Sequence, residues 1–259
     1  MKPLILISND DGYQAKGLLV LTGIARQLGN VVVMSTELNA SAKSMSLTTN
    51  MPLRARLIEK VEATEELGSV KVYASNGTPT DNIKLAVEHF CSSRPDLVVS
   101  GINHGSNASI NVLYSGTLGA ALEAAVSGYP AIGFSILDPI PEPDFSYCEP
   151  YVELIMRLAL EKGLEKGLCL NVNFPYTQLG PIKGMKVCRA SKAEWTDSYQ
   201  KRLDPMSKPY YWLTGKFECT DNDEGTDQWA LANGYASIVP LRPDYTAFDA
   251  IDAINNMIL

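Results

Sequence analysis

The sequence has few of the residues that build zinc centres and disulfide frameworks. Its 259 residues include two histidines, His89 and His104, and five cysteines, none of which forms a Cys-x-x-Cys pair. An odd cysteine count without paired spacing favours reduced, mostly buried thiols in a cytoplasmic protein. Two separated histidines are too few for a zinc trio. We expect His89 to be structural, and for His104, which follows Asn103, both a role near the substrate and a structural role stay open.

Long apolar runs and an excess of positive charge are also absent. No run approaches the length of a membrane span, and the short apolar run near the N-terminus is too short for a signal peptide. The formal net charge of -7 argues against a nucleic-acid polymer as partner, because such a partner requires a basic face. Small anionic substrates stay compatible, because a bound metal ion reverses the local field.

Three common motifs of nucleotide and phosphate chemistry are missing. The sequence contains no Gly-x-Gly-x-x-Gly and no Walker motif, which lowers support for a dinucleotide site and for a P-loop. No Asp-x-Asp follows the first apolar run, which weakens the case for a phosphatase with an aspartyl nucleophile.

What is present is an alternation of short apolar runs and helical stripes. This pattern predicts an α/β fold with right-handed crossovers and a mainly parallel sheet. The predicted strands are Leu4–Ile7, Val31–Met34, Leu53–Val61, Val70–Ser75, Leu97–Ser100, Ala131–Ser135, Leu168–Val172 and Tyr235–Pro240. The predicted helices are Gly17–Leu28, Pro79–Phe90, Tyr114–Ser127, Tyr151–Glu161 and one near Ala247–Met257.

The pattern changes after about Pro181. Aromatic and polar residues then interleave without helical periodicity, from Trp195 through Tyr211 to Phe217. We expect a single domain over residues 1–259, in which about 181–230 forms an extended hairpin arm. An arm with several large rings has little core of its own, so we expect it to pack on another subunit. The alternative is a β-excursion folded back on its own domain.

Two adjacent aspartates, Asp10 and Asp11, end the first predicted strand. Neighbouring carboxylates repel each other and are costly to desolvate unless a cation or a donor neutralises them. Ligands of open α/β sheets bind at the carboxyl ends of strands, and hard oxygen donors there suit Mg²⁺ or Mn²⁺. The alternative is a solvated turn in which Asn9 or Asp10 caps the next helix.

Loops after other predicted strands carry further oxygen and amide groups, among them Ser41, Asn103 and Asn107. In a parallel sheet these loops share one rim, where two carboxylates, a hydroxyl and an amide carbonyl would make an oxygen-only metal site. Ser115, Gly116 and Thr117 start a predicted helix and would offer backbone N–H groups to an anion. Each part has a simpler alternative: Ser41 as a capping hydroxyl, Asn103 as a turn residue, and Ser115–Thr117 as a plain N-cap.

Several motifs in register resemble the survival protein SurE family, a family of metal-dependent 5′-nucleotidases. They are Ser8-Asn9-Asp10-Asp11-Gly12, Asn39-Ala40-Ser41, Gly77-Thr78-Pro79-Thr80-Asp81, Ser100-Gly101-Ile102-Asn103, Tyr114-Ser115-Gly116-Thr117, Asn171-Val172-Asn173-Phe174-Pro175 and Gly225-Thr226-Asp227. The resemblance covers nearly the whole chain. It implies a Rossmann-like three-layer α/β/α fold with a mainly parallel sheet and a C-terminal β-hairpin excursion. It further implies a homodimer or homotetramer with exchanged arms.

The resemblance also implies the site. One divalent metal ion per subunit, Mg²⁺, Mn²⁺ or similar, would be held by Asp10, Asp11, Ser41 and Asn103. Substrate phosphate would meet Asn107, Ser115, Gly116 and Thr117. The reaction would be hydrolysis of nucleoside 5′-monophosphates, with 3′-monophosphates and short polyphosphate as further substrates of some members. We expect water activated by the ion, or oriented by Asp11 or Asn9, to attack phosphorus.

The chain departs from the family pattern at three places. Ala40 stands where many members have an arginine, although Lys43 could replace it as a point charge. Asn111 lies in a segment that often carries a carboxylate, and His104 and Ser106 are also unusual. These departures concern substrate preference. Two other functions stay open: a non-enzymatic nucleotide- or phosphate-sensing module, and a metal-dependent phosphatase for esters without a nucleoside.

Overall fold

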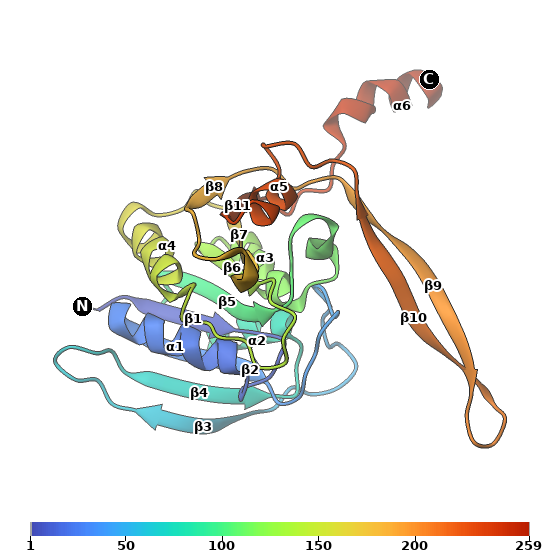
Figure 1. Ribbon diagram of the computed structural model, residues 1–259. Helices are drawn as coiled ribbons and strands as arrows, with labels where there is room; N and C mark the ends of the chain where they lie inside the picture. Colours follow the sequence, from blue (N-terminus) through green and yellow to red (C-terminus); the bar gives the residue numbers. More distant parts are fainter. Residues whose placement is uncertain (1, 259) are drawn as a thin grey trace.

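The computed structural model describes residues 2–258, and within them a nine-stranded sheet forms the centre of the molecule (Figure 1). The strand order is β3-β4-β2-β1-β5-β6-β7-β11-β8. The strands of this sheet are β1 (Leu4–Ser8), β2 (Asn30–Thr36), β3 (Ala55–Val61), β4 (Val70–Ser75), β5 (Leu97–His104), β6 (Ala131–Ile136), β7 (Cys169–Phe174), β8 (Met185–Val187) and β11 (Ala236–Leu241). Strands β9 (Ala193–Leu203) and β10 (Pro209–Cys219) form a separate antiparallel pair.

The central strands are parallel, as the sequence predicts. Strand β1 pairs in parallel with β2 and β5, and the parallel pairing continues through β6 to β7. All five residues of β1 are buried, which is typical of a strand covered on both faces. Two pairs are antiparallel: β3 with β4, and β11 with β7.

Helices cover both faces of the sheet and complete three layers. Helix α1 (Lys16–Leu28) and α4 (Glu149–Lys162) contact each other and share a core with Ile5 and Ile7 of β1. On the other face, α2 (Pro79–His89) and α3 (Gly116–Val126) pack against Leu4 and Leu6. Successive β1 side chains therefore enter opposite cores, as the two-residue period of a strand requires. The prediction of a Rossmann-like α/β/α architecture is confirmed.

Smaller elements differ from the prediction. The expected helix Tyr114–Ser127 is present as α3, which runs from Gly116 to Val126 with Ser115 as its N-cap, and an unpredicted 3₁₀ turn, η1 (Ser109–Leu113), precedes it. The C-terminal helix is divided into η3 (Phe248–Ala250) and α6 (Ile251–Ile258). The prediction missed the short elements η2 (Thr177–Leu179), β8 and α5 (Asp227–Ala232), because they are too short to show periodicity.

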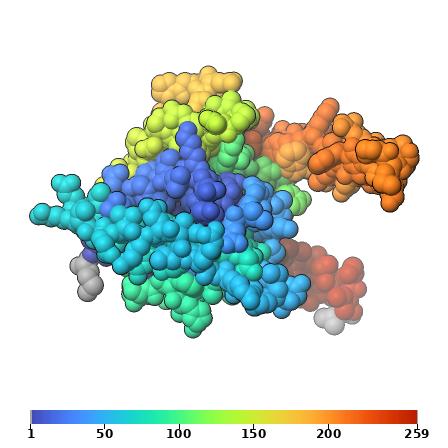
Figure 2. All heavy atoms as spheres, turned by 90° about the horizontal axis from the view of Figure 1, so that it is seen from below, coloured from blue at the N-terminus to red at the C-terminus, as the bar shows by residue number. Residues whose placement is uncertain are grey.

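The β9–β10 hairpin extends away from the sheet (Figure 1), and the space-filling view shows it as an arm beside the main body (Figure 2). Tyr199, Tyr211 and Trp212 on this hairpin are exposed. Helix α6 also stands apart, with Ile254 and Met257 exposed. The predicted hairpin is therefore present and does not fold back on the sheet. Within residues 2–258, no helix is both long enough and apolar enough to span a bilayer.

All five cysteines are free thiols, and Cys148, Cys169 and Cys188 are buried. Burial raises the pKa of Cys148 and Cys169 to about 12, so both stay protonated at neutral pH. The expectation of reduced, mostly buried thiols agrees with this arrangement.

Candidate active site at the carboxyl ends of the strands

One cavity of about 550 Å³ opens at the carboxyl ends of β1 and β5. Five residues predicted from the sequence line it: Asp10, Ser41, Asn103, Asn107 and Ser115. They come from the loop after β1, the loop after β2, and the end of β5 with its connection to α3, so the parallel sheet brings together side chains that are distant in sequence. The base of the hairpin closes part of the cavity with residues that the sequence analysis did not connect to the site: Trp195, Asp197, Leu213, Thr214 and Gly215.

Asp10 is the most buried acid at this cavity, with 3% of its surface exposed. The Thr117 hydroxyl donates a hydrogen bond of 2.5 Å to Asp10 Oδ1. Backbone amides of Thr117 and Gly116 at the start of α3 also favour the ionised carboxylate. Gly116 is needed for this approach, because a Cβ there would lie 2.8 Å from Asp10 Oδ2. Desolvation nevertheless outweighs these bonds, and the pKa of Asp10 is raised.

Asp11 is half-buried beside Asp10. Desolvation and the neighbouring Asp10 charge raise the pKa of Asp11 to about 6, against a smaller opposing effect of His104. Among the ion pairs of residues 2–258, none joins a Lys or Arg to either carboxylate. Two adjacent carboxyl groups thus lie in a poorly solvated place without a protein cation, which is an electrostatic environment that a bound cation would relieve.

Asn103 reaches this place because β5 is irregular. The pairing of β5 with β6 shifts register between Ser100 and Asn103. Such a bulge re-aims side chains next to functional sites. The Asn103 amide Nδ2 donates to Gly105 O at 2.8 Å, and Asn103 Oδ1 lies 3.3 Å from Thr117 Oγ1. The hydroxyl of Thr117 therefore lies between the side-chain oxygens of Asp10 and Asn103.

Ser41 lies on an exposed loop that is tied to the sheet. The Ala40 amide donates to Asp10 O at 2.7 Å, and the Ser41 amide donates to Asn39 Oδ1 at 2.9 Å. The next residue, Ala42, has φ of 59°, a left-handed conformation that costs free energy without glycine. These constraints hold the Ser41 hydroxyl at the cavity wall.

Asn9 is held in place by contacts within the protein. Both of its polar atoms are bonded to protein: Nδ2 donates to Gly12 O at 3.0 Å, and Oδ1 accepts from Ser35 Oγ at 2.5 Å. Asn9 is buried and is not part of the cavity wall as described. These bonds stabilise the turn after β1, and a role of Asn9 in orienting water stays a prediction. The capping alternative is wrong, because the N-cap of α1 is Ala15 and makes no side-chain bond.

The predicted phosphate residues divide into two groups. Asn107 and Ser115 line the cavity, although Ser115 also caps α3 by accepting from the Leu118 amide at 3.0 Å, as one alternative had it. The Thr117 hydroxyl instead bonds Asp10, and the first amides of α3 favour the Asp10 charge. The helix start thus faces an anion of the protein itself, the carboxylate of Asp10, and the assignment of Gly116 and Thr117 to substrate phosphate stays a prediction.

A buried set of amides and hydroxyls fixes the Asn107 loop. The backbone N–H of Asn107 donates to Asn173 Oδ1 at 2.9 Å, and the side-chain Nδ2 of Asn107 donates to Ser135 Oγ at 2.8 Å. Asn171 Nδ2 in turn donates to Asn107 O at 2.8 Å. This network gives a physical role to the Asn-Val-Asn motif of β7, which the sequence analysis used only as a mark of resemblance. Within residues 2–258, no hydrogen-bond donor reaches the Asn107 Oδ1 atom.

His104 supports both alternatives kept for it. It lines the cavity, and its Nε2 atom lies 2.8 Å from Asp138 O. The ring is thus held by a backbone carbonyl while it borders the site. The other histidine, His89, is the last residue of α2 and does not line this cavity.

The donor set at this cavity fits a hard divalent cation. Asp10, Ser41 and Asn103 line the cavity, and Asp11 adjoins Asp10 without being part of the lining. Two carboxylates, the Asn103 amide oxygen and the Ser41 hydroxyl are the oxygen types that Mg²⁺ and Mn²⁺ prefer. Within residues 2–258 no group of three or more His, Cys, Asp or Glu side chains comes together, so the site would use two carboxylates and neutral oxygens. The raised pKa values of Asp10 and Asp11 are the observation that favours a cation here.

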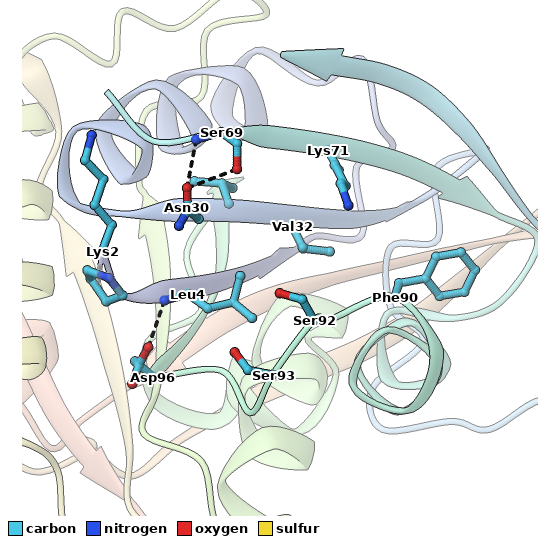
Figure 3. A pocket seen from close by; sticks show the side chains of 12 residues that line it. Lys2, Leu4, Asn30, Val32, Ser69, Lys71, Phe90, Ser92, Ser93 and Asp96 are labelled. Carbon is cyan, nitrogen blue, oxygen red and sulfur yellow. Dashed lines mark hydrogen bonds between the residues drawn. The ribbon is translucent and has the colours of Figure 1, made fainter. Parts of the chain in front are cut away.

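A second cavity, of about 430 Å³, lies at the amino ends of the same strands (Figure 3). Lys2, Lys71, Ser92 and Ser93 border it, together with Asp96, which accepts a 2.8 Å hydrogen bond from the Leu4 amide. Leu4, Val32 and Phe90 also line this cavity. It has one carboxylate, which is already hydrogen-bonded, and so lacks the paired acids of the first cavity.

The fold and the first cavity define a Rossmann-like α/β protein with an acidic, oxygen-lined site at the carboxyl edge of its sheet. The family model "Survival protein SurE" matches residues 5–197, and the chain belongs to this family. It is 48% identical over 255 residues to "5′-nucleotidase SurE" of Flavobacterium psychrophilum, covering 98% of this chain and 97% of the relative. It is 44% identical to the protein of the same name from Bacteroides fragilis, covering 98% and 97%.

A solved structure supports the same relationship. The SurE protein from Aquifex aeolicus matches with a TM-score of 0.79 and 34% sequence identity, covering 98% of this chain and 99% of that one. The predicted family membership is thereby confirmed over the full sheet and the hairpin.

Proposed function

We propose that this chain is a metal-dependent 5′-nucleotidase, a phosphoric monoester hydrolase that converts nucleoside 5′-monophosphates to nucleoside and phosphate. The observation that carries the proposal is the adjacent pair Asp10 and Asp11, of which Asp10 lines a cavity together with Ser41 and Asn103. Both carboxyl groups have raised pKa values, and within residues 2–258 neither forms an ion pair with Lys or Arg. The relatives named 5′-nucleotidase SurE support the same substrate class. A cavity of about 550 Å³ is in the size range of small-molecule sites.

The residues at the cavity have different proposed roles. Asp10, Asp11, Ser41 and Asn103 would hold one divalent cation, of which Mg²⁺ and Mn²⁺ are the first choices. When bound, such an ion supplies charge neutralisation at phosphate and lowers the pKa of water. Thr117 orients Asp10 through its hydroxyl, and the first α3 amides oppose part of the rise in the Asp10 pKa that burial causes. Ser115 and Asn107 present polar groups to the cavity, where a substrate phosphate would be oriented.

We also propose how copies associate and where the protein acts. The exposed rings of the hairpin and the exposed apolar side of α6 favour assembly into a homodimer or homotetramer. Five unpaired thiols favour a reducing compartment, the cytoplasm. Sedimentation of the purified protein tests the assembly, because a monomer at micromolar concentration contradicts it.

The test of the proposed activity is a matrix of metals and substrates. Purified protein is assayed for phosphate release from AMP, GMP, IMP and a sugar phosphate, with Mg²⁺, Mn²⁺ or EDTA. We expect release from the nucleotides with metal and none with EDTA. Binding of nucleotide without any phosphate release would favour the sensing module. Faster release from the sugar phosphate than from every nucleotide would favour a phosphatase for other esters.

A further inference from the structure

The base of the hairpin contributes a planar wall and a carboxylate to the candidate active site. Trp195 and Asp197 of β9 both line the cavity that contains Asp10 and Asn103. Residues two apart on a strand point to the same side, so the ring and the carboxylate belong to one face of the hairpin. Tyr114, with 55% of its surface exposed, adds a second aromatic side chain to the same cavity.

The Trp195 ring is held in place by two contacts. Its Nε1 donates a 2.8 Å hydrogen bond to Asn111 Oδ1 of η1, and Phe217 packs edge-on against it with ring centroids 5.6 Å apart. Asn111 is one of the positions at which the sequence departs from the family pattern, and here it ties the arm to the body. Because the indole N–H is already bonded, Trp195 offers the cavity an aromatic surface and no free donor.

The space beside Asp197 is kept open by glycine. Gly215 of β10 is the cross-strand partner of Asp197, and both line the cavity. A Cβ at Gly215 would lie 3.3 Å from Asp197 Oδ1, so a larger residue would crowd the carboxylate. Asp197 is exposed to the cavity mouth, and the ion pairs of residues 2–258 include none with Asp197. Its two oxygens are therefore acceptors available to a ligand.

We propose that Trp195 and Asp197 form the nucleobase subsite of this enzyme and select guanine. The proposal rests on the nucleotidase activity proposed above and names its substrate. Guanine presents two neighbouring donors, N1–H and the N2 amino group, which match the two oxygens of one carboxylate. Adenine presents an acceptor at N1, which a carboxylate repels, and hypoxanthine lacks the N2 donor. Stacking on Trp195 would hold any base, and Asp197 would discriminate among them.

The first experiment compares kcat/KM for GMP, IMP and AMP in the metal-loaded protein. Because Asp197 is exposed to solvent, we expect GMP to exceed AMP by about tenfold, well below the discrimination of a buried polar site. Asp197→Asn replaces one acceptor with a donor and should lower the GMP-to-AMP ratio about tenfold. Glu194→Gln is the matched control: Glu194 lies on the same strand with its side chain on the opposite face, and its ratio should not change.

The second experiment measures binding without metal or turnover. In a Trp212→Phe, Trp229→Phe background, Trp195 is the remaining tryptophan. GMP with EDTA should quench its fluorescence at lower concentration than AMP does. Because the Trp195 variants lose this signal, their GMP binding is measured by titration calorimetry in the otherwise unchanged protein, where Trp195→Leu should weaken binding more than Trp195→Phe, which keeps a ring. The inference is overturned if AMP binds as tightly as GMP, or if Asp197→Asn leaves the GMP-to-AMP ratio unchanged. If no nucleotide is hydrolysed but GMP still binds selectively, the proposed activity fails and the base subsite stands.

Discussion

Each end of the central sheet has a cavity lined by polar residues, and the acidic side chains at the two cavities have different electrostatic surroundings. At the amino ends (Figure 3), Asp96 is exposed, accepts a hydrogen bond from the Leu4 amide, and shares its cavity with Lys2 and Lys71. At the carboxyl ends, Asp10 is buried beside Asp11, and within residues 2–258 neither forms an ion pair with Lys or Arg. Asp96 therefore has a hydrogen-bond donor and lysines nearby, whereas Asp10 and Asp11 have each other as the neighbouring charge.

The comparison shows which polar cavity is the better candidate for function. Unsatisfied charge destabilises a fold, so it persists where it has a use that offsets its cost. The amino-end cavity is lined by two lysines and one hydrogen-bonded carboxylate, and so has no pair of adjacent acids. At the carboxyl-end cavity, Asp10 in the lining and Asp11 next to it are two carboxylates that a divalent cation would neutralise. The following predictions test this contrast, from the largest effect to the smallest.

Replacement of Asp10 should have the largest effect. Asp10→Asn removes one charge and one ligand oxygen while keeping the side-chain shape. Changes to residues that only support metal ligands cost 10–100-fold, so loss of a ligand should lower kcat/KM for GMP by more than about 100-fold. The far-ultraviolet circular dichroism spectrum should not change. Wild-type kcat/KM in this variant would remove Asp10 from the site.

Replacement of Thr117 should have a smaller effect on the same carboxylate. Thr117→Val keeps the volume and removes the hydroxyl that donates to Asp10 Oδ1. We expect the Mn²⁺ concentration for half-maximal activity to rise about tenfold, the effect typical of a residue that orients a ligand. Thr117→Ser is the control and should stay close to wild type, since it keeps the hydroxyl. Equal effects of Val and Ser would indicate that packing, and not the hydrogen bond, matters at this position.

The sheet and its functional edge could be predicted from the sequence for a physical reason. Strands buried on both faces are continuous apolar runs, and the carboxyl ends of parallel strands meet at one edge. The end of β1 at Asp10 and the polar end of β5 at Asn103 were therefore expected to lie close together, and they line one cavity. The hairpin could also be predicted, because its aromatic and polar residues interleave without a helical period.

Other features depend on contacts that no local pattern records. The orientation of β11 and the presence of Trp195 at the cavity result from long-range packing. The contacts of Asn9 and Thr117 could not be predicted for the same reason: their partners, Ser35 and Asp10, lie 26 and 107 residues away. The type of residue indicated hydrogen bonding in each case, but the partner decides whether the group faces a ligand or the protein.

Replacement of Asp11 should show how much its charge destabilises the metal-free protein. Its folded pKa of about 6 lies above the ordinary value of 3.8, so the native state holds its proton more tightly than the unfolded state does. Stability in EDTA should therefore fall as pH rises from about 4 to about 6 and stay lower above that range. Asp11→Asn should remove this loss and raise the free energy of unfolding at pH 7 by on the order of 1–2 kcal/mol, allowing for solvent screening.

Urea denaturation in EDTA at pH 4 and pH 7 measures this effect. The variant should gain stability at pH 7 and little or none at pH 4, where both forms are mostly uncharged in the native state. Added Mn²⁺ should reverse the order at pH 7, because the wild type gains binding free energy that the variant lacks. A variant less stable than wild type in EDTA at pH 7 would show that Asp11 is already satisfied by protein groups.

Asp96 at the amino ends should behave in the opposite way and show the smallest effect. Asp96→Ala leaves the Leu4 amide without its acceptor and should lower the free energy of unfolding by about 1 kcal/mol, the usual net value of one hydrogen bond. Asp96→Asn keeps an acceptor oxygen and should lose less. Neither change should alter kcat/KM for GMP or the Mn²⁺ requirement, because the Asp96 carboxylate already accepts a hydrogen bond from the protein and lies at the other end of the sheet. A tenfold loss of activity in Asp96→Ala at unchanged stability would mean that the amino-end cavity communicates with the site, and the contrast between the two ends would fail.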